Sequence, residues 1–335
     1  MSAHAFAAVS HAAPRVRAAR PLSRTHRVSS RTPAATGNTT TGSDFVDASV
    51  LANNAASLDG KLRTLVVGVT DFQGDERLGH RNATSGTLFK HDRWLDQYTT
   101  PGQEVTLVDL DSGKSCKRAI SVSPYRARAT APNTDVSVVE FLLDSGSDDG
   151  DENFFAKAQP PCRLLVSSVT GSGFANPMFR ELNLKNAVDD KHALVLIAGG
   201  ARGIGPMRAA LEWPVVASHA DKYPVTLFYL NAGAKQSNGK SSAFVEEWDE
   251  WRAGGVGVVP LFGGTESMDG NVFQVQSAIA GGVPVECGGK GRKILGNDAE
   301  KVTVLMAGLT REETKTAIAV FCDTHGVPKS NLLNF

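Results

Sequence analysis

Hydrophobic and polar positions alternate in short β-rich runs between residues 62 and about 175. The runs cover residues 62–69, 104–110, 119–123, 135–143 and 162–169. Turn signals such as Pro101-Gly102 separate the runs. Short strands of this spacing, divided by turns, are typical of a small antiparallel barrel or sandwich. The first half of the chain is therefore predicted to be mainly β.

The rhythm changes from residue 193, where continuous apolar runs alternate with helical patterns. Strands are predicted at 193–198, 225–230, 256–261 and 302–307, and helices from Pro206 and at 242–251, about 272–279 and 311–322. Continuously apolar strands are buried on both faces, and alternation with helices indicates a parallel sheet. The second half is predicted to be a doubly wound α/β unit.

The segment before Asp44 contains arginine but neither lysine nor any acidic residue. Its arginines are Arg15, Arg17, Arg20, Arg24, Arg27 and Arg31, set among many Ala, Ser and Thr. This bias predicts an organelle transit peptide, followed by a small-residue linker to about residue 60. The alternative is a basic tail that binds nucleic acid, and the lack of lysine and interleaved aromatics disfavours it.

Charge and cysteine content exclude several classes of partner. Without the six arginines, 35 − 6 = 29 basic side chains face 35 acidic ones, so nucleic acid is not an expected partner. The cysteines Cys116, Cys162, Cys287 and Cys322 are scattered without metal-ligand spacing, so no metal site is predicted. Apolar runs stay far below the roughly 18 residues of a membrane span, so at most peripheral membrane association is expected.

The strongest chemical signal is the segment 193–206, in which an apolar strand leads into a glycine-rich turn and then a helix. The turn contains Gly199, Gly200, Arg202, Gly203 and Gly205, and Pro206 is expected to start the helix. Glycines let backbone N–H groups approach a pyrophosphate, and a helix N-terminus carries partial positive charge. A dinucleotide site is therefore predicted here, with Arg202 as a further phosphate contact.

The same turn also resembles that of short-chain dehydrogenases, which carry a catalytic Tyr-x-x-x-Lys. No tyrosine of this chain has Lys four residues later, and only about 130 residues follow the turn. That family is rejected, since its Rossmann domain needs more chain than this.

Residues 62–335 resemble the ferredoxin reductase superfamily, in particular its plastid kiwifruit-protein type and the electron-transfer subunit of dihydroorotate dehydrogenase. The matching pieces are Pro101-Gly102-Gln103, Arg118-Ala119-Ile120-Ser121, residues 170–174, residues 198–206, Gly233-Ala234-Lys235 and the ending 326–335. The resemblance implies an FAD-binding barrel at 61–190 and an NAD(P)-binding α/β domain at 191–335. It also implies that residues 1–60 precede both domains.

Within that resemblance, Arg118 would hold the flavin pyrophosphate and Ser121 would bond the flavin ring edge. Ile120 replaces an aromatic residue that stacks on the ring, and Asn153 is the remaining side chain of a phosphate loop set in an acidic run. The aspartates of this run are expected to be solvated at a hairpin tip; they are Asp144, Asp148, Asp149 and Asp151. Gly308 would allow close approach to the nicotinamide, although Ala307 stands where the family has cysteine.

Lys235 would contact the adenosine side of the dinucleotide. The resemblance therefore implies a chloroplast oxidoreductase, stromal or thylakoid-associated, with FAD and NAD(P)H as cofactors. Its partners would be a nicotinamide nucleotide and an unidentified electron acceptor. The alternative is a non-catalytic reductase-like subunit whose flavin site has degraded.

Overall fold

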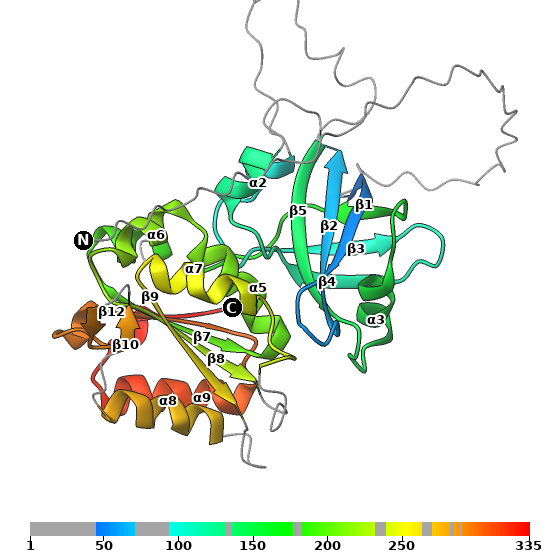
Figure 1. Ribbon diagram of the computed structural model, residues 1–335. Helices are drawn as coiled ribbons and strands as arrows, with labels where there is room; N and C mark the ends of the chain where they lie inside the picture. The colour runs from blue at the N-terminus through cyan, green and yellow to red at the C-terminus, as the bar shows by residue number, and fades with distance from the viewer. Residues whose placement is uncertain are drawn as a thin grey trace, which may run out of the picture. The chain divides into compact units, whose positions relative to one another are not determined.

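A computed structural model describes residues 45–70, 94–130, 136–176, 178, 183–231, 239–262, 270–281, 285–287 and 290–335. All of them fall within one compact unit. Two sheets organise this unit, and they divide at about residue 180 (Figure 1). The prediction of a β-rich first half and an α/β second half is confirmed.

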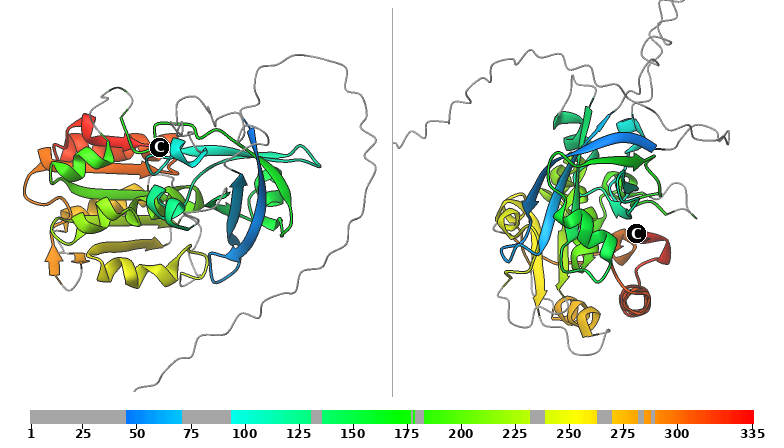
Figure 2. Two further views of the ribbon diagram at one scale, coloured as in Figure 1. Left: turned by 90° about the horizontal axis from the view of Figure 1, so that it is seen from above. Right: turned by 90° about the vertical axis from the view of Figure 1, so that its right-hand side faces the viewer.

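The first sheet has six antiparallel strands in the order β4-β3-β6-β1-β2-β5. Its strands are β1 (Phe45–Ala55), β2 (Leu62–Thr70), β3 (Glu104–Asp109), β4 (Ser115–Ala119), β5 (Val136–Asp144) and β6 (Arg163–Ser167). The sheet is strongly curled, as the bent strands β1 and β2 in Figure 2 show. A hydrogen bond of 2.8 Å from the amide of Ser121, just after β4, to the carbonyl of Glu140, in the middle of β5, links the two edges of the sheet. The sheet is therefore a curled half-barrel whose edges approach each other beyond β4.

Strand β1 corrects the predicted linker, which was placed across residues 37–60. Hydrophobic and polar residues do not alternate clearly in this segment, because polar and small residues occupy many positions. Only Ala48 and Val50 of the strand are buried. Pairing to both β2 and β6 nevertheless fixes the strand inside the sheet. The barrel core includes Val50, Cys116, Ile120, Phe141 and Phe155, all nearly inaccessible to solvent.

Short helices cover the barrel. They are η1 (Trp94–Gln97), α2 (Pro124–Thr130) and α3 (Gly150–Lys157). Helix α3 replaces the predicted hairpin tip, because Asp149 caps it by accepting from the amides of Asp151 and Glu152 at 3.1 and 3.3 Å. Aspartate is a favourable N-cap, and acidic residues in the first turn match the helix dipole. The acidic run is therefore a helix start.

The second sheet has five parallel strands in the order β13-β12-β7-β8-β9. Its strands are β7 (Ala193–Gly199), β8 (Val225–Asn231), β9 (Val256–Phe262), β12 (Val302–Ala307) and β13 (Leu332–Asn334). Four of them match the predicted apolar runs to within a residue. A separate two-stranded sheet pairs β10 (Val285–Cys287) with β11 (Lys290–Arg292).

Helices cover both faces of the second sheet (Figures 1 and 2). One face carries α5 (Gly200–Leu211), α6 (Pro214–Ala220) and α7 (Trp248–Ala253), the other α8 (Gly270–Ala280), α9 (Arg311–Ile318) and the π-helical turn η4 (Ala319–Thr324). The remaining elements are α4 (Leu184–Asp189), η2 (Val245–Glu247), η3 (Ala299–Lys301) and η5 (Lys329–Asn331).

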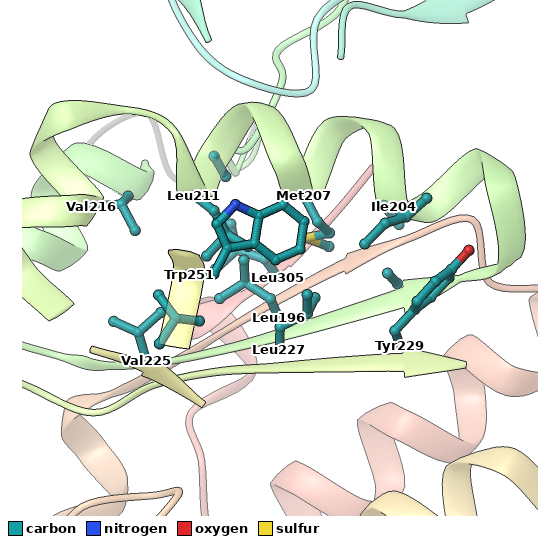
Figure 3. Close-up of a cluster of buried hydrophobic side chains, with 14 of the residues drawn as sticks. Leu196, Ile204, Met207, Leu211, Val216, Val225, Leu227, Tyr229, Trp251 and Leu305 are labelled. Atoms are coloured by element: carbon teal, nitrogen blue, oxygen red, sulfur yellow. The ribbon is translucent and has the colours of Figure 1, made fainter. Parts of the chain in front are cut away.

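Figure 3 shows the core beneath α5, where Ile204, Met207 and Leu211 pack onto Leu196 and Leu227 of the sheet. Each such side chain contributes about 1.5–3 kcal/mol when it is fully buried. This packing fixes α5 over β7 and so positions the first turn of the helix at the sheet edge. Among the described helices, none is long and apolar enough to cross a membrane.

Candidate functional site

Helix α5 begins at Gly200, directly at the carboxyl end of β7. The predicted start at Pro206 was wrong, because the glycine-rich segment that reads as a turn is already helical. Gly200 has φ +57°, a left-handed conformation that glycine adopts without steric cost. Pro206 lies inside the helix, where it cannot donate a backbone hydrogen bond to the preceding turn. The segment presents a helix N-terminus at the edge where parallel sheets hold nucleotides.

Three of the predicted site glycines pack against one another. A Cβ on Gly203 would lie 2.3 Å from the carbonyl oxygen of Ala307, and one on Gly199 would lie 2.4 Å from that of Gly308. Gly308 itself has φ +68° and approaches the Gly199 carbonyl in the same way. These positions need glycine because the backbones leaving β7 and β12 cross within contact distance.

Gly205 and Ser121 bring the two sheets together. A Cβ on Gly205 would be 3.4 Å from the Ser121 Cβ, so α5 covers the end of β4. Ser121 is fully buried, and its hydroxyl has no hydrogen-bond partner among the described residues. A buried hydroxyl without a partner costs free energy, which marks Ser121 as an unusual position in the interface.

Arg118 lies on β4 with its side chain only 11% exposed, and it forms an ion pair with Glu152 of α3. The Glu152 side chain is only 3% exposed, and its Oε1 also accepts from the Asp144 amide at 3.1 Å. Glu152 is therefore a buried partner of Arg118. Arg118 keeps one unused donor, because its Nε has no partner among the described residues.

Arg202 of helix α5 also approaches Glu152, and in addition Asp149. Its Nη2 lies 3.6 Å from Oε2 of Glu152 and 3.8 Å from Oδ2 of Asp149. Hydrogen bonds from the α3 backbone, first of all the Glu152 amide, hold the pKa of the Asp149 carboxyl below its usual range. We call Arg118, Asp149, Glu152 and Arg202 the Glu152 cluster. It contains two cations and two carboxylates, so its formal charge is zero.

The other predicted residues lie apart from this cluster. Asn153 donates its side-chain amide to the Ser145 carbonyl at 2.9 Å, so this group is committed within the loop that precedes α3. Ile120 is fully buried in the barrel core, where it packs without offering a face to a ring. Lys235 lies outside the described residues, and its contact with a dinucleotide stays a prediction.

A hollow of about 110 Å³ connects several of these groups. It is lined by Arg118, Arg202, Gly205 and Pro206 of the predicted site, together with Glu104, Lys117, Ala119, Leu142, Ala201 and Phe335. Phe335 stacks obliquely on Phe174, with ring centroids 6.3 Å apart, and supplies an aromatic wall. Sites for drug-sized ligands usually measure about 300–1,000 Å³, so this hollow is small.

The donors at the hollow fit a diphosphate attached to an aromatic ring. Arg118 has an unused Nε, Arg202 is largely exposed, and α5 points its N-terminus toward the same edge. Cations, helix N-termini and aromatic walls are the groups that such ligands require. The volume, however, requires the groups at the hollow to rearrange before such a ligand enters.

A second set of charges joins the two sheets farther along α5. Arg208 is only 4% exposed. Its guanidinium contacts both oxygens of Glu247 at 3.0 and 2.9 Å and Oε2 of Glu140 at 2.6 Å. It also lies 3.2 Å from Glu212, which pairs with Arg126 of α2 at 2.5 Å. We call Arg126, Glu140, Arg208, Glu212 and Glu247 the Arg208 cluster.

The Arg208 cluster is electrostatically satisfied. Burial by itself would lower the pKa of Arg208, but hydrogen bonds to Glu247 and the nearby carboxylates raise it above the ordinary value. Burial raises the pKa of Glu212, although Arg208 and Arg126 oppose this. The guanidinium also lies over the Phe244 ring, 4.5 Å from its centroid. All the guanidinium nitrogens of Arg208 contact acceptors. The cluster therefore stabilises the packing of α5 against both sheets.

Sequence reasoning did not identify the pairing roles of Glu152 and Arg208. Arg208 carries only a weak signal, a charged residue at an apolar helical position. Glu152 sits in an acidic run that resembles a solvated loop, and Arg118, its partner, is 34 residues away on a different element. Ion pairs of this kind need the tertiary structure to bring their members together.

Comparison with known proteins gives a fold but no close relative. No profile of a known protein family matches the sequence, and no curated protein matches it. Among solved structures, a ferredoxin–NADP+ reductase from Neisseria gonorrhoeae with bound FAD and NADP aligns with a TM-score of 0.52 and 13% identity. The alignment covers 88% of this chain and 99% of that one.

Two further structures give the same result. A cytochrome P450 reductase from Amycolatopsis, GcoB, aligns with a TM-score of 0.54 and 14% identity over 87% of this chain and 68% of its own. A ferredoxin–NADP+ reductase variant from Plasmodium falciparum with 2′-phospho-AMP aligns with a TM-score of 0.51 and 12% identity, covering 87% and 96%. The chain therefore has the two-sheet fold of the ferredoxin–NADP+ reductases.

Proposed function

We propose that this chain is a flavin-dependent NAD(P)H oxidoreductase that transfers electrons to an acceptor in the plastid. One observation carries the proposal: Arg118 of the barrel and the N-terminus of α5 line a single hollow between the two sheets. Fold alone does not define chemistry, so the argument depends on these groups.

Different residues would bind the flavin and the nicotinamide nucleotide. Arg118 and Arg202 are the cations available to a flavin diphosphate, and Phe335 is the aromatic surface available to a ring. Gly200 at the start of α5 has no atom within 4 Å of the place where a Cβ would lie, so a nicotinamide nucleotide can approach the backbone there. A bound flavin would supply the step from hydride to single electrons.

Solved structures with this fold support the two cofactors, since one of them contains FAD and NADP. NADH and NADPH are both retained as donors, because Lys235 lies outside the described residues. The proposal names no particular electron acceptor.

Flavin binding tests the proposal directly. We expect the purified full-length chain to bind added FAD with a shift of its visible absorption bands, and then to reduce an artificial acceptor with NADH or NADPH. A chain that stays colourless after FAD addition and dialysis contradicts the proposal. The variant Lys185→Met, in an exposed pair with Asp189, provides a control that lies away from the hollow.

A non-catalytic reductase-like subunit is the second candidate, and a specific observation favours it. Glu152 already neutralises Arg118, Asn153 is committed to the backbone, and the hollow measures about 110 Å³. This candidate predicts stable association with a plastid complex and no NAD(P)H oxidation. Turnover with FAD that is lost in Arg118→Met rules it out.

The plastid location follows from the arginine-rich segment before Asp44. Peripheral association with thylakoids is part of the same proposal. Fusion of residues 1–60 to a fluorescent protein should direct it to plastids, and a cytosolic signal contradicts this location.

A further inference from the structure

Glu152 holds its carboxylate at the place where the proposed site needs an external anion. Arg118 comes from β4 of the first sheet and Arg202 from helix α5, and Oε2 of Glu152 contacts both of them. The Glu152 side chain is only 3% exposed. A buried carboxylate between two arginines occupies the same charge-assisted donors that a phosphate oxygen would use.

We infer that Glu152 is a built-in anion that competes with a diphosphate for Arg118 and Arg202. This inference rests on the proposed function and adds a specificity residue to the same hollow. A diphosphate ligand, such as that of FAD, must displace the Glu152 carboxylate before both arginines can bind it. Glu152 therefore weakens diphosphate binding and selects against it relative to ligands without phosphate.

Charge counting explains the direction of the effect. The two cations of the Glu152 cluster face two carboxylates, Asp149 and Glu152, so an entering diphosphate meets no excess positive charge. Removing the Glu152 charge leaves the cluster at +1. The charge of Glu152 acts on Arg118 with little screening, because both side chains are buried, whereas the exposed pair of Arg202 and Asp149 is screened by solvent.

The geometry also holds the two carboxylates of the cluster beside the arginines. Glu152 is tied to the first sheet by its bond from the Asp144 amide, and Asp149 caps α3 beneath Arg202. Both carboxylates thus lie at fixed positions beside the arginines. A diphosphate that binds Arg118 must therefore separate Arg118 from Glu152.

Inorganic pyrophosphate tests the inference without any flavin. In thermal unfolding of the full-length chain, pyrophosphate should raise the Tm of Glu152→Gln by about 3 °C and leave the wild type nearly unchanged. Asp148→Asn removes the same charge from an exposed position in the same loop and serves as the matched control. It should behave as the wild type does. Adding Arg118→Met to Glu152→Gln should abolish the shift.

Flavin titrations separate this inference from the proposed function. FAD should bind Glu152→Gln about tenfold more tightly than the wild type, the effect of one charge-assisted contact. Riboflavin, which has no phosphate, should bind both proteins equally. If neither protein binds FAD, the proposed function fails, and the pyrophosphate result still decides the inference.

Asp149→Asn provides a second variant in case Glu152→Gln fails to fold. Asparagine is as good an N-cap as aspartate, so α3 and the buried pair are retained while one charge facing Arg202 disappears. Pyrophosphate should then bind about threefold more tightly than to the wild type. Equal or weaker pyrophosphate binding in both Glu152→Gln and Asp149→Asn overturns the inference.

Discussion

The two charged clusters on α5 join the same sheets but differ in how fully their arginines are used. In the Arg208 cluster every nitrogen of the guanidinium contacts an acceptor, and three carboxylates surround it. In the Glu152 cluster the Nε of Arg118 has no partner among the described residues, and Arg202 is 62% exposed.

This difference separates a structural role from a functional one. A buried arginine whose donors all have acceptors has none left for a ligand. Its removal leaves buried carboxylates without a partner. An arginine with an unused donor beside a hollow keeps capacity for an anion. Arg208, in the second half of α5, therefore stabilises the fold. Arg202, in the first turn of the same helix, is the residue proposed to contact a ligand.

The largest expected effect comes from Arg208→Met, which leaves Glu140, Glu212 and Glu247 without their shared cation. We expect a loss of about 4–5 kcal/mol in the free energy of unfolding, at the upper end for broken buried pairs. Urea denaturation followed by circular dichroism measures it. Lys185→Met breaks an exposed pair and should cost no more than about 0.5 kcal/mol. Similar losses in both variants would contradict the structural role of Arg208.

Arg118→Met should lower the free energy of unfolding by about 3 kcal/mol. The substitution leaves Glu152, whose side chain is 3% exposed, without its cationic partner. The double variant Arg118→Met/Glu152→Met replaces the pair by apolar side chains and should recover most of this loss. A double-mutant cycle in urea gives the coupling energy. Additive losses would mean that the two side chains do not interact, and would remove the basis of the Glu152 cluster.

Gly203→Ala should shift α5 as a whole and disturb both clusters. Its Cβ would lie 2.3 Å from the Ala307 carbonyl oxygen, so we expect a loss of about 2–3 kcal/mol. Gly200→Ala meets no atom within 4 Å and should cost only about 1–2 kcal/mol, from its positive φ. Thermal unfolding of both variants checks the order. The reverse order would contradict the backbone crossing at β12.

The smallest effect is a pH dependence that involves neither cluster. Burial lowers the pKa of His192, whose Nδ1 lies 2.9 Å from the Thr303 hydroxyl, while Asp190 and Asp298 oppose this shift and Lys301 adds to it. Because the folded pKa lies below the unfolded value, stability is complete above about pH 6.5 and falls as the pH drops below it. His192→Gln should flatten that fall in urea titrations between pH 7 and 5, and an unchanged slope would contradict it. His325 has the same sign and stays in place as a reference.

Sequence alone predicts the second sheet well, because strands buried on both faces appear as unbroken apolar runs. Strand β12 matches its predicted run residue for residue. Strand β1 was missed, since its polar and small residues give no period-two pattern. Helix α5 was predicted to start six residues late, because a glycine-rich run resembles a turn until its packing against Ala307 is known.

The candidate site was predictable only in part. Arg118 and Arg202 were identified from motifs, and the structure brings them to one hollow. Their shared carboxylate partner, Glu152, was not identified from the sequence. Its pairing depends on how β4, α3 and α5 pack against one another. Local sequence gives the type of each side chain, whereas its neighbours across the interface come from the fold.

Cys116 lies on β4 two residues from Arg118 and is 4% exposed. Burial raises the pKa of this thiol to about 11, even though the Arg118 charge opposes it. Thiolate is the reactive form, so alkylating reagents reach Cys116 only when the barrel opens. The half-buried Cys322 at the end of the second sheet's helices is partly accessible in the folded chain and serves as a reference for the reagent. The labelling rate of Cys116 relative to that of Cys322 can therefore report how often the barrel opens.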